Sequence, residues 1–363
     1  MNNLDRRSAA TTRNSTPKGE VSGVLETLAA GLSMVIARPY LFILPLLVDL
    51  WAWLGVQVRA DALIVAMQDL LRDQGGSNGD TIASELDNVV ESLRINDLVA
   101  SLTPSIFGGL PLDSLLNLVF TFLAPAMTVG IDRADMYGAW AGGLGRTVNP
   151  EAWGGVIGIA ALCLLVASVM LALFKVPIAQ AVRGGRFSFG GFLRDVVLGW
   201  VRILALGSIV LTLTVAVGLP VLIVAQILMF AGINLVAVIS LVLIIGLAMG
   251  ALYTYFLLDA MFIYRVGPIR SAKMSYAVAR ANLGPTWRFA AASILVATGL
   301  LQVWDVLVQN PPGIVIALVL NAVIGTSLSI ASMMFFHDRA RMPRPIMPGA
   351  HTNGRRSYLP FGS

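Results

Sequence analysis

Four polar residues inside apolar stretches mark the places where this sequence could do chemistry. Asp49, Asp259 and Asp305 carry carboxyl groups in or beside stretches long enough to cross a membrane, and Asn321 carries an amide in another. Ionisable groups are costly in lipid, so they mark ion paths, substrate sites or buried pairs. Asp305 lies a turn from the outer end of its stretch, where we expect water. These four residues are the candidate intramembrane polar sites.

Asp49 and Asp259 could each have a structural role in place of a functional one. Asp49 lies deepest, and it either handles an ion or substrate or makes a packing hydrogen bond to Asn321 or Gln226. Asp259 lies about one and a half turns before Arg265, which favours a snorkelling or interhelical ion pair. Either acid would also suit the path of a permease.

The sequence offers no template for an enzyme. Both histidines, His337 and His351, follow the last apolar stretch, and Cys163 is the single cysteine. A Ser-His-Asp or Cys-His site therefore has no base in the membrane stretches. The sequence shows no metal-ligand cluster and no P-loop. We predict a non-enzymatic protein without a cofactor.

Composition places these residues in a membrane protein. Apolar residues make up 57% of the 363 residues and charged residues 12%, against roughly 25% charged in soluble proteins. The formal net charge of +5 could suggest nucleic acid, but the basic residues flank the apolar stretches. We therefore predict membrane lipids, with anionic headgroups at the basic loops, as partners, and no nucleic acid.

Six stretches reach the roughly 20 apolar residues that a spanning helix needs. The turns at 231–234 and 309–313 are short, so the spans on either side of each form antiparallel hairpins. The predicted fold is all-α: a polytopic protein with six transmembrane helices. The spans are Tyr40–Val58, Ala152–Phe174, Ile203–Phe230, Leu235–Tyr264, Phe289–Val308 and Ile314–Phe336.

Charge asymmetry predicts the orientation. Residues 59–151 contain five of the 25 basic residues but 12 of the 20 acidic ones. Cytoplasmic connections of membrane proteins are enriched in Lys and Arg. The basic connections 175–202 and 265–288 are therefore predicted to be cytoplasmic, as are both termini.

The same asymmetry divides the chain into domains. Residues 59–151 are predicted to form an extracytoplasmic helical insert, the place for a protein partner, and within it 111–131 favours a re-entrant or interfacial segment over a seventh span. Residues 23–58 hold an in-plane helix and the first span. Residues 152–338 form a five-span bundle. The polar ends, 1–22 and 339–363, are predicted to be disordered cytoplasmic tails.

A threefold pattern precedes the outward-going spans. Val24–Arg38, Phe187–Arg202 and Pro268–Asn282 each combine apolar residues at helical spacing with basic ends. Such helices lie in the headgroup plane. We predict three units, each made of an in-plane helix, an outward span and an inward span.

Two glycine pairs have the spacing that allows close helix packing. Gly154–Gly158 and Gly246–Gly250 are glycine pairs at a spacing of four. Such pairs let two helices approach closely.

Two segments resemble a known group of proteins. The first segment, Arg38-Pro39-Tyr40-Leu41-Phe42-Ile43-Leu44-Pro45, is similar to an opening of the form R-x-P-x-L-x-x-x-P. In the second, Asp259 is followed by a basic helix containing Ser275, Arg280 and Asn282. Both are similar to segments of a loose bacterial membrane superfamily that includes the membrane domain attached to glycerophosphodiester phosphodiesterases and free-standing uncharacterised relatives. The resemblance covers about 50 residues and implies a multi-pass protein of the bacterial cytoplasmic (inner) membrane. It implies no catalysis, because the attached soluble domain does that chemistry.

The sequence leaves two functions open. The first is an integral membrane protein that organises or supports membrane assemblies through the insert and the in-plane helices. The alternative is a small transporter or lipid-handling permease that uses Asp49 and Asp259.

Overall fold

The computed structural model describes residues 23–55, 57–58, 69, 99, 102–106, 147–148, 153–184, 189–230, 246 and 249–341. The described chain is almost entirely helical, as predicted. The strands β1 (Gln57–Val58) and β2 (Thr147–Val148) pair in parallel near the two ends of the predicted insert. Nearly all of the insert, including 111–131, lies outside the described residues, as do 1–22 and 342–363. The helices are α1 (Val24–Ala37), α2 (Tyr40–Leu54), α7 (Trp153–Val182), α8 (Phe189–Phe230), α10 (Leu257–Ile263), α11 (Pro268–Ala281), α12 (Leu283–Leu307) and α13 (Pro311–Ala340).

Four of the described helices are long and apolar enough to cross a membrane: α7, α8, α12 and α13. The pair α1 and α2 qualifies as a fifth only if it is counted as one span, and the two helices meet at 86°. The predicted fourth span, Leu235–Tyr264, falls partly on residues 235–245 and 247–248, outside the described part. Four to five candidate spans support the membrane class, and the count of six stays a prediction.

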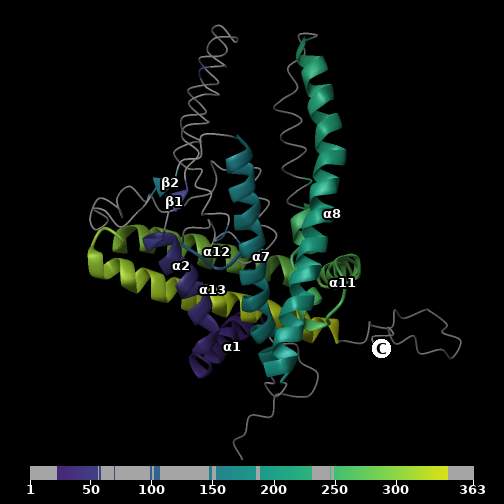
Figure 1. The fold of residues 1–363 in the computed structure, drawn as a ribbon. Coiled ribbons are helices and arrows are strands. Elements are labelled where there is room, and N and C mark those ends of the chain that lie inside the picture. The colour runs from purple at the N-terminus through teal and green to yellow at the C-terminus, as the bar shows by residue number, and fades with distance from the viewer. Residues whose placement is uncertain are drawn as a thin grey trace, which may run out of the picture.

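The two long hairpins run in different directions. In Figure 1, α7 and α8 rise side by side, whereas α12 and α13 run across them near their lower ends. Spanning helices tilt by about 0–40° from the membrane normal. The five-span bundle predicted for 152–338 therefore stays a prediction, because these hairpins do not share one axis.

The first two helices show the predicted break at Arg38 and Pro39. Glu26 caps α1 by accepting the Gly23 N–H at 3.0 Å. The helix ends at Ala37, because Arg38 precedes a proline and such a residue avoids the helical conformation. The following helix, α2, begins directly after Pro39 and ends at Leu54, short of the predicted end at Val58. The in-plane orientation of α1 stays a prediction.

The second predicted in-plane helix is wrong, because α8 is continuous from Phe189 to Phe230. Trp200 donates from its indole N–H to Ser168 Oγ on α7 at 2.9 Å, and Gly199 lets the Phe262 ring approach. This packing keeps the backbone helical across the predicted boundary at 202. A helix of 42 residues is about 63 Å long, about twice the hydrocarbon thickness. The helix is therefore longer than one membrane crossing requires.

A separate helix, α11, covers the third predicted in-plane segment, starting at Pro268 and ending before Asn282. Its in-plane orientation stays a prediction. The last helix, α13, corrects the predicted tail boundary at 339. It runs to Ala340, and Arg339 lies 3.3 Å above the Phe335 ring, 7% exposed. The C-terminal tail can begin only after this stacked arginine.

The core lies where α7, α10 and α13 meet. Phe256, Phe289 and Phe335 are fully buried there, with the rings of Phe289 and Phe335 4.5 Å apart. Phe256 stacks on Phe335 at 5.4 Å. This aromatic cluster surrounds the start of α10, which carries Asp259.

Candidate functional site

The helix leading to Asp259 is broken one turn before it. Helical residues up to Thr254 are followed by a turn at Tyr255 and Phe256, and α10 then begins at Leu257. A break leaves backbone groups without their helical partners. Ser275 of α11 satisfies two of them: its hydroxyl donates to the Tyr253 carbonyl at 2.8 Å and accepts the Phe256 N–H at 3.2 Å. Ser275 thus fixes the start of α10.

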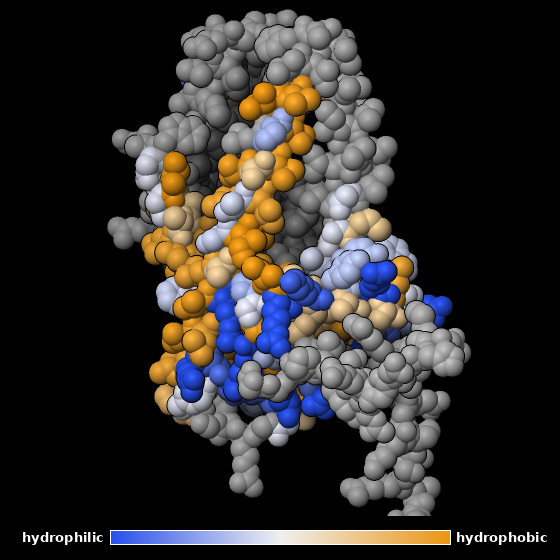
Figure 2. Space-filling model, turned by 90° about the vertical axis from the view of Figure 1, so that its right-hand side faces the viewer, coloured by the Kyte–Doolittle hydropathy of each residue, from blue (hydrophilic) through white to orange (hydrophobic). Residues whose placement is uncertain are grey.

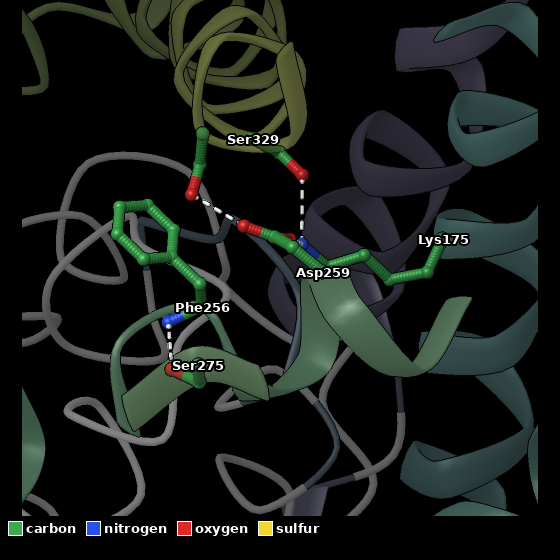
Figure 3. Close-up of polar contacts among 6 residues, drawn as sticks. Lys175, Phe256, Asp259, Ser275 and Ser329 are labelled. Atoms are coloured by element: carbon green, nitrogen blue, oxygen red, sulfur yellow. Dashed lines mark hydrogen bonds and ion pairs between the residues drawn. The ribbon is translucent and has the colours of Figure 1, made fainter. Parts of the chain in front are cut away.

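Asp259 forms a buried ion pair with Lys175. The Lys175 ammonium of α7 donates to Asp259 Oδ1 at 2.9 Å and to Ser329 Oγ of α13 at 3.1 Å. Ser332 of α13 donates to the other carboxylate oxygen. Figure 3 shows Lys175 and Ser329 converging on Asp259 from different helices. These four residues form the Lys–Asp cluster.

The Lys–Asp cluster is enclosed and charge-neutral as a pair. Lys175 is 1% exposed and Asp259 is 2% exposed. Removing two charges from water costs several kcal/mol per ion, and the attraction offsets this only when further hydrogen bonds complete the geometry. Ser329 and Ser332 supply such bonds. The cluster therefore joins α7, α10 and α13 at one point.

A second buried carboxylate lies at Asp49 on α2. Asn321 of α13 donates to Asp49 Oδ2 at 3.4 Å, and Ser105 donates to Oδ1. Asp49 and Ser105 are 0% exposed and Asn321 is 1% exposed. The hydrogen bond to Asn321 is the one expected from the sequence, whereas Gln226 has no described side-chain position. Ser105 brings a piece of the predicted insert down to the membrane helices.

One face of α13 carries hydrogen-bond donors to both buried carboxylates, Asp49 and Asp259. Asn321 and Ser329 are eight residues apart, with Gly325 between them and Ser332 beyond. Spacings of four, eight and eleven residues fall on one helical face. At 1.5 Å per residue, Asn321 and Ser329 are about 12 Å apart along the axis. The polar stripe of α13 thus connects the surroundings of Asp49 with the Lys–Asp cluster.

Among the described residues, five buried side-chain polar atoms on α12 and α13 have no hydrogen-bond partner, and two of the five belong to the surroundings of Asp49. These two are Asn321 Oδ1, beside Asp49, and the indole Nε1 of Trp304. Trp304 is 1% exposed and shares an apolar cluster with Val48, the neighbour of Asp49. A buried polar group without a partner costs about 1–3 kcal/mol. The surroundings of Asp49 therefore keep an unused acceptor and donor.

Two further sequence predictions concern the exposure of Asp305 and the ion-pair partner of Asp259. Asp305 is exposed, and its contact with water stays a prediction. Arg265 pairs with Asp195 of α8 and not with Asp259. Asp259 is instead part of an interhelical ion pair, one of the two kinds predicted.

Lys175 is the site residue that sequence reasoning misses. As the first charge after an apolar stretch, it falls at the start of the predicted cytoplasmic connection 175–202. In the structure α7 continues to Val182 and encloses it. The signal that could have found it is the run of seven uncharged residues after Lys175, which extends the helical pattern.

The groups available for chemistry at this site are the buried carboxylates of Asp49 and Asp259 and the buried ammonium of Lys175. The described residues hold no group of three or more His, Cys, Asp or Glu side chains that could bind a metal ion. Lys175 and Asp259 can exchange a proton or hold each other, and Asp49 can accept from hydroxyl and amide donors. Comparisons with protein-family models, with curated proteins and with solved structures give no match.

Proposed function

We propose that this chain is a non-enzymatic integral membrane protein that organises or supports an assembly at the membrane. The observation that carries the proposal is the Lys–Asp cluster. Its charges are directed at each other and at two serines, so they serve to connect helices. The partner surface we propose is the insert, residues 59–151, on the extracytoplasmic side.

The exposed surface supports a membrane setting. Figure 2 shows apolar side chains rising in a column above a band of hydrophilic ones. Large apolar side chains remain exposed along α8 and α12, including Leu211, Val217 and Leu295. A soluble monomer rarely exposes so continuous an apolar surface. The proposed surroundings are lipid along the helices and water at the hydrophilic band.

Crosslinking in intact cells tests the organising role. A photo-reactive crosslinker is applied, the chain is purified, and co-purifying proteins are identified by mass spectrometry. We expect a defined partner that is lost when residues 60–150 are replaced by a short Gly-Ser linker. The control deletes the tail from 343 onward, which should leave the partner in place. A partner retained without the insert would contradict the assignment.

A permease is the second candidate, favoured by the polar stripe of α13. Broken helices and buried charges near the centre of a bundle are features of secondary transporters. The break before Asp259 and the partnerless Asn321 Oδ1 agree with such a path.

Reconstituted vesicles separate the two candidates. A permease predicts proton or lipid flux that Asp49→Asn abolishes while the protein stays folded. Asp305→Asn, on an exposed residue, is the matched control. An organising protein predicts no flux from the wild type or either variant.

A further inference from the structure

Two arginines pair with one carboxylate near the junction of α7 and α8, and a third lies within electrostatic range. The Arg265 guanidinium donates to Asp195 Oδ2, and Arg183 NH2 lies 3.6 Å from the same oxygen. Arg202 interacts electrostatically with both Asp195 and Arg265. We call Arg183, Arg202, Arg265 and Asp195 the arginine cluster.

The arginine cluster has more positive charge than Asp195 can neutralise. Three guanidinium groups against one carboxylate leave two positive charges, and among the described residues Asp195 is the carboxylate paired with them. The pKa of Arg183 is lowered from its ordinary value, first because burial disfavours the charged form and then because Arg265 repels it. An anion placed among these groups would relieve that repulsion.

The cluster is held in place and still reachable. The Arg183 guanidinium also donates to the Ile263 carbonyl at 3.2 Å, and Gln180 donates to Asp195 Oδ2 at 3.3 Å. The Arg183 side chain is 23% exposed and that of Arg265 is 55% exposed. Positioned guanidinium groups that face water match the oxygens of a phosphate.

An apolar surface adjoins the cluster along α8. Ile209 and Leu213 follow Arg202 by seven and eleven residues, on the same helical face. Together with Ser208 and Thr212 they line a shallow hollow of about 280 Å³, about 10 Å along the helix from Arg202. In Figure 2 the hydrophilic band meets the apolar column directly. A ligand with a phosphate and a hydrocarbon chain fits this order of groups.

We propose that the arginine cluster binds the phosphate of an anionic phospholipid whose acyl chains lie along α8. Basic pockets between membrane helices are suited to such headgroups. The inference rests on the proposed membrane setting but needs no protein partner. Failure of the crosslinking experiment would therefore leave it intact.

Lipid titration of the full chain tests the site. The protein in mild detergent is titrated with phosphatidylglycerol, phosphatidylcholine or inorganic phosphate, and bound lipid is counted by native mass spectrometry. We expect phosphatidylglycerol to bind at least about tenfold more tightly than phosphatidylcholine, because one hydrogen bond to a charged group changes affinity by about a factor of ten or more. Arg183→Gln/Arg265→Gln should remove that preference. The matched control, Arg280→Gln/Arg288→Gln, removes two exposed charges elsewhere and should keep it.

A charge-preserving pair guards against misfolding of the Gln variant. Arg183→Lys/Arg265→Lys retains the ion pairs with Asp195 but loses the forked geometry, so we expect weakened binding with an unchanged thermal midpoint. Wild-type affinity in the Lys pair, or equal losses in cluster and control pairs, would show diffuse attraction and overturn the site. Binding of inorganic phosphate without any of the lipid would overturn the lipid assignment, whereas competition between the two would support it.

Discussion

The sequence identifies Asp259 as a candidate site residue but does not identify its partner, Lys175. Asp259 is recognisable, because an acid in an apolar stretch is costly in lipid. Its partner is not, because 84 residues separate the two and no local pattern relates them. Asp49 and Asn321 can be matched because each is an isolated polar residue deep in its own span. Lys175 instead resembles the start of a loop.

Removing one partner of the Lys–Asp cluster should destabilise the protein more than removing both. Lys175→Met leaves a buried carboxylate unpaired, at a cost of about 3–5 kcal/mol. The double variant Lys175→Met/Asp259→Leu should recover most of that loss. Unfolding in mixed micelles with increasing dodecyl sulfate measures both. Equal stability of the single and double variants would contradict a pair that acts as a unit.

Ser275 should matter through the break that it satisfies. Ser275→Ala leaves the Phe256 N–H and the Tyr253 carbonyl without their partner, at a cost of about 1–3 kcal/mol. Ser208→Ala is the matched control, since the exposed Ser208 hydroxyl bonds only to its own helix and should change stability little. Thermal unfolding followed by tryptophan fluorescence compares them. Equal effects would mean that the break is held by other contacts.

At the scale of elements, sequence locates helices better than it locates their boundaries. The helices α1, α11, α12 and α13 lie where apolar spacing and prolines predict them. The boundary at Arg202 fails because it depends on charge, whereas packing of Trp200 and Gly199 on neighbouring helices continues α8. The glycine pair Gly154–Gly158 does not lie at a close helix contact among the described residues, since a Cβ at either position would meet nothing within 4 Å.

Gly31 is the glycine that a helix contact requires. A Cβ there would lie 2.4 Å from the Ser327 carbonyl oxygen of α13. Gly31→Ala should force α1 away from α13 and cost about 1–3 kcal/mol, as overpacking does. Gly207→Ala, where a Cβ meets nothing within 4 Å, should be neutral or stabilising by up to about 1 kcal/mol. Thermal midpoints in detergent check both, and a harmless Gly31→Ala would contradict the close approach.

At the scale of the whole molecule, composition predicts the class but not the arrangement. Hydropathy tests each helix alone, so it identifies helices that could span without saying whether they share an axis. The crossing of α12 and α13 over α7 and α8 depends on packing between distant segments (Figure 1). Charge asymmetry adds an orientation, which only labelling can test.

Site-specific labelling of intact cells tests that orientation. In a Cys163→Ala background, Asn310→Cys should react with a membrane-impermeant maleimide from outside, because six spans place that turn outside. Ala277→Cys, on an exposed position of α11, should react only after the membrane is opened. Labelling of both from the same side would mean that α12 does not cross the membrane.

The distance along the chain between Lys175 and Asp259 has a consequence for biogenesis. Lys175 is synthesised 84 residues before Asp259, so the ion pair can form only after most of the chain has been made. A product truncated before residue 259 would lack the partner of a charge that α7 buries, and a lone charge is costly inside a membrane bundle. We therefore expect truncated products to persist in the membrane for a shorter time than the full chain.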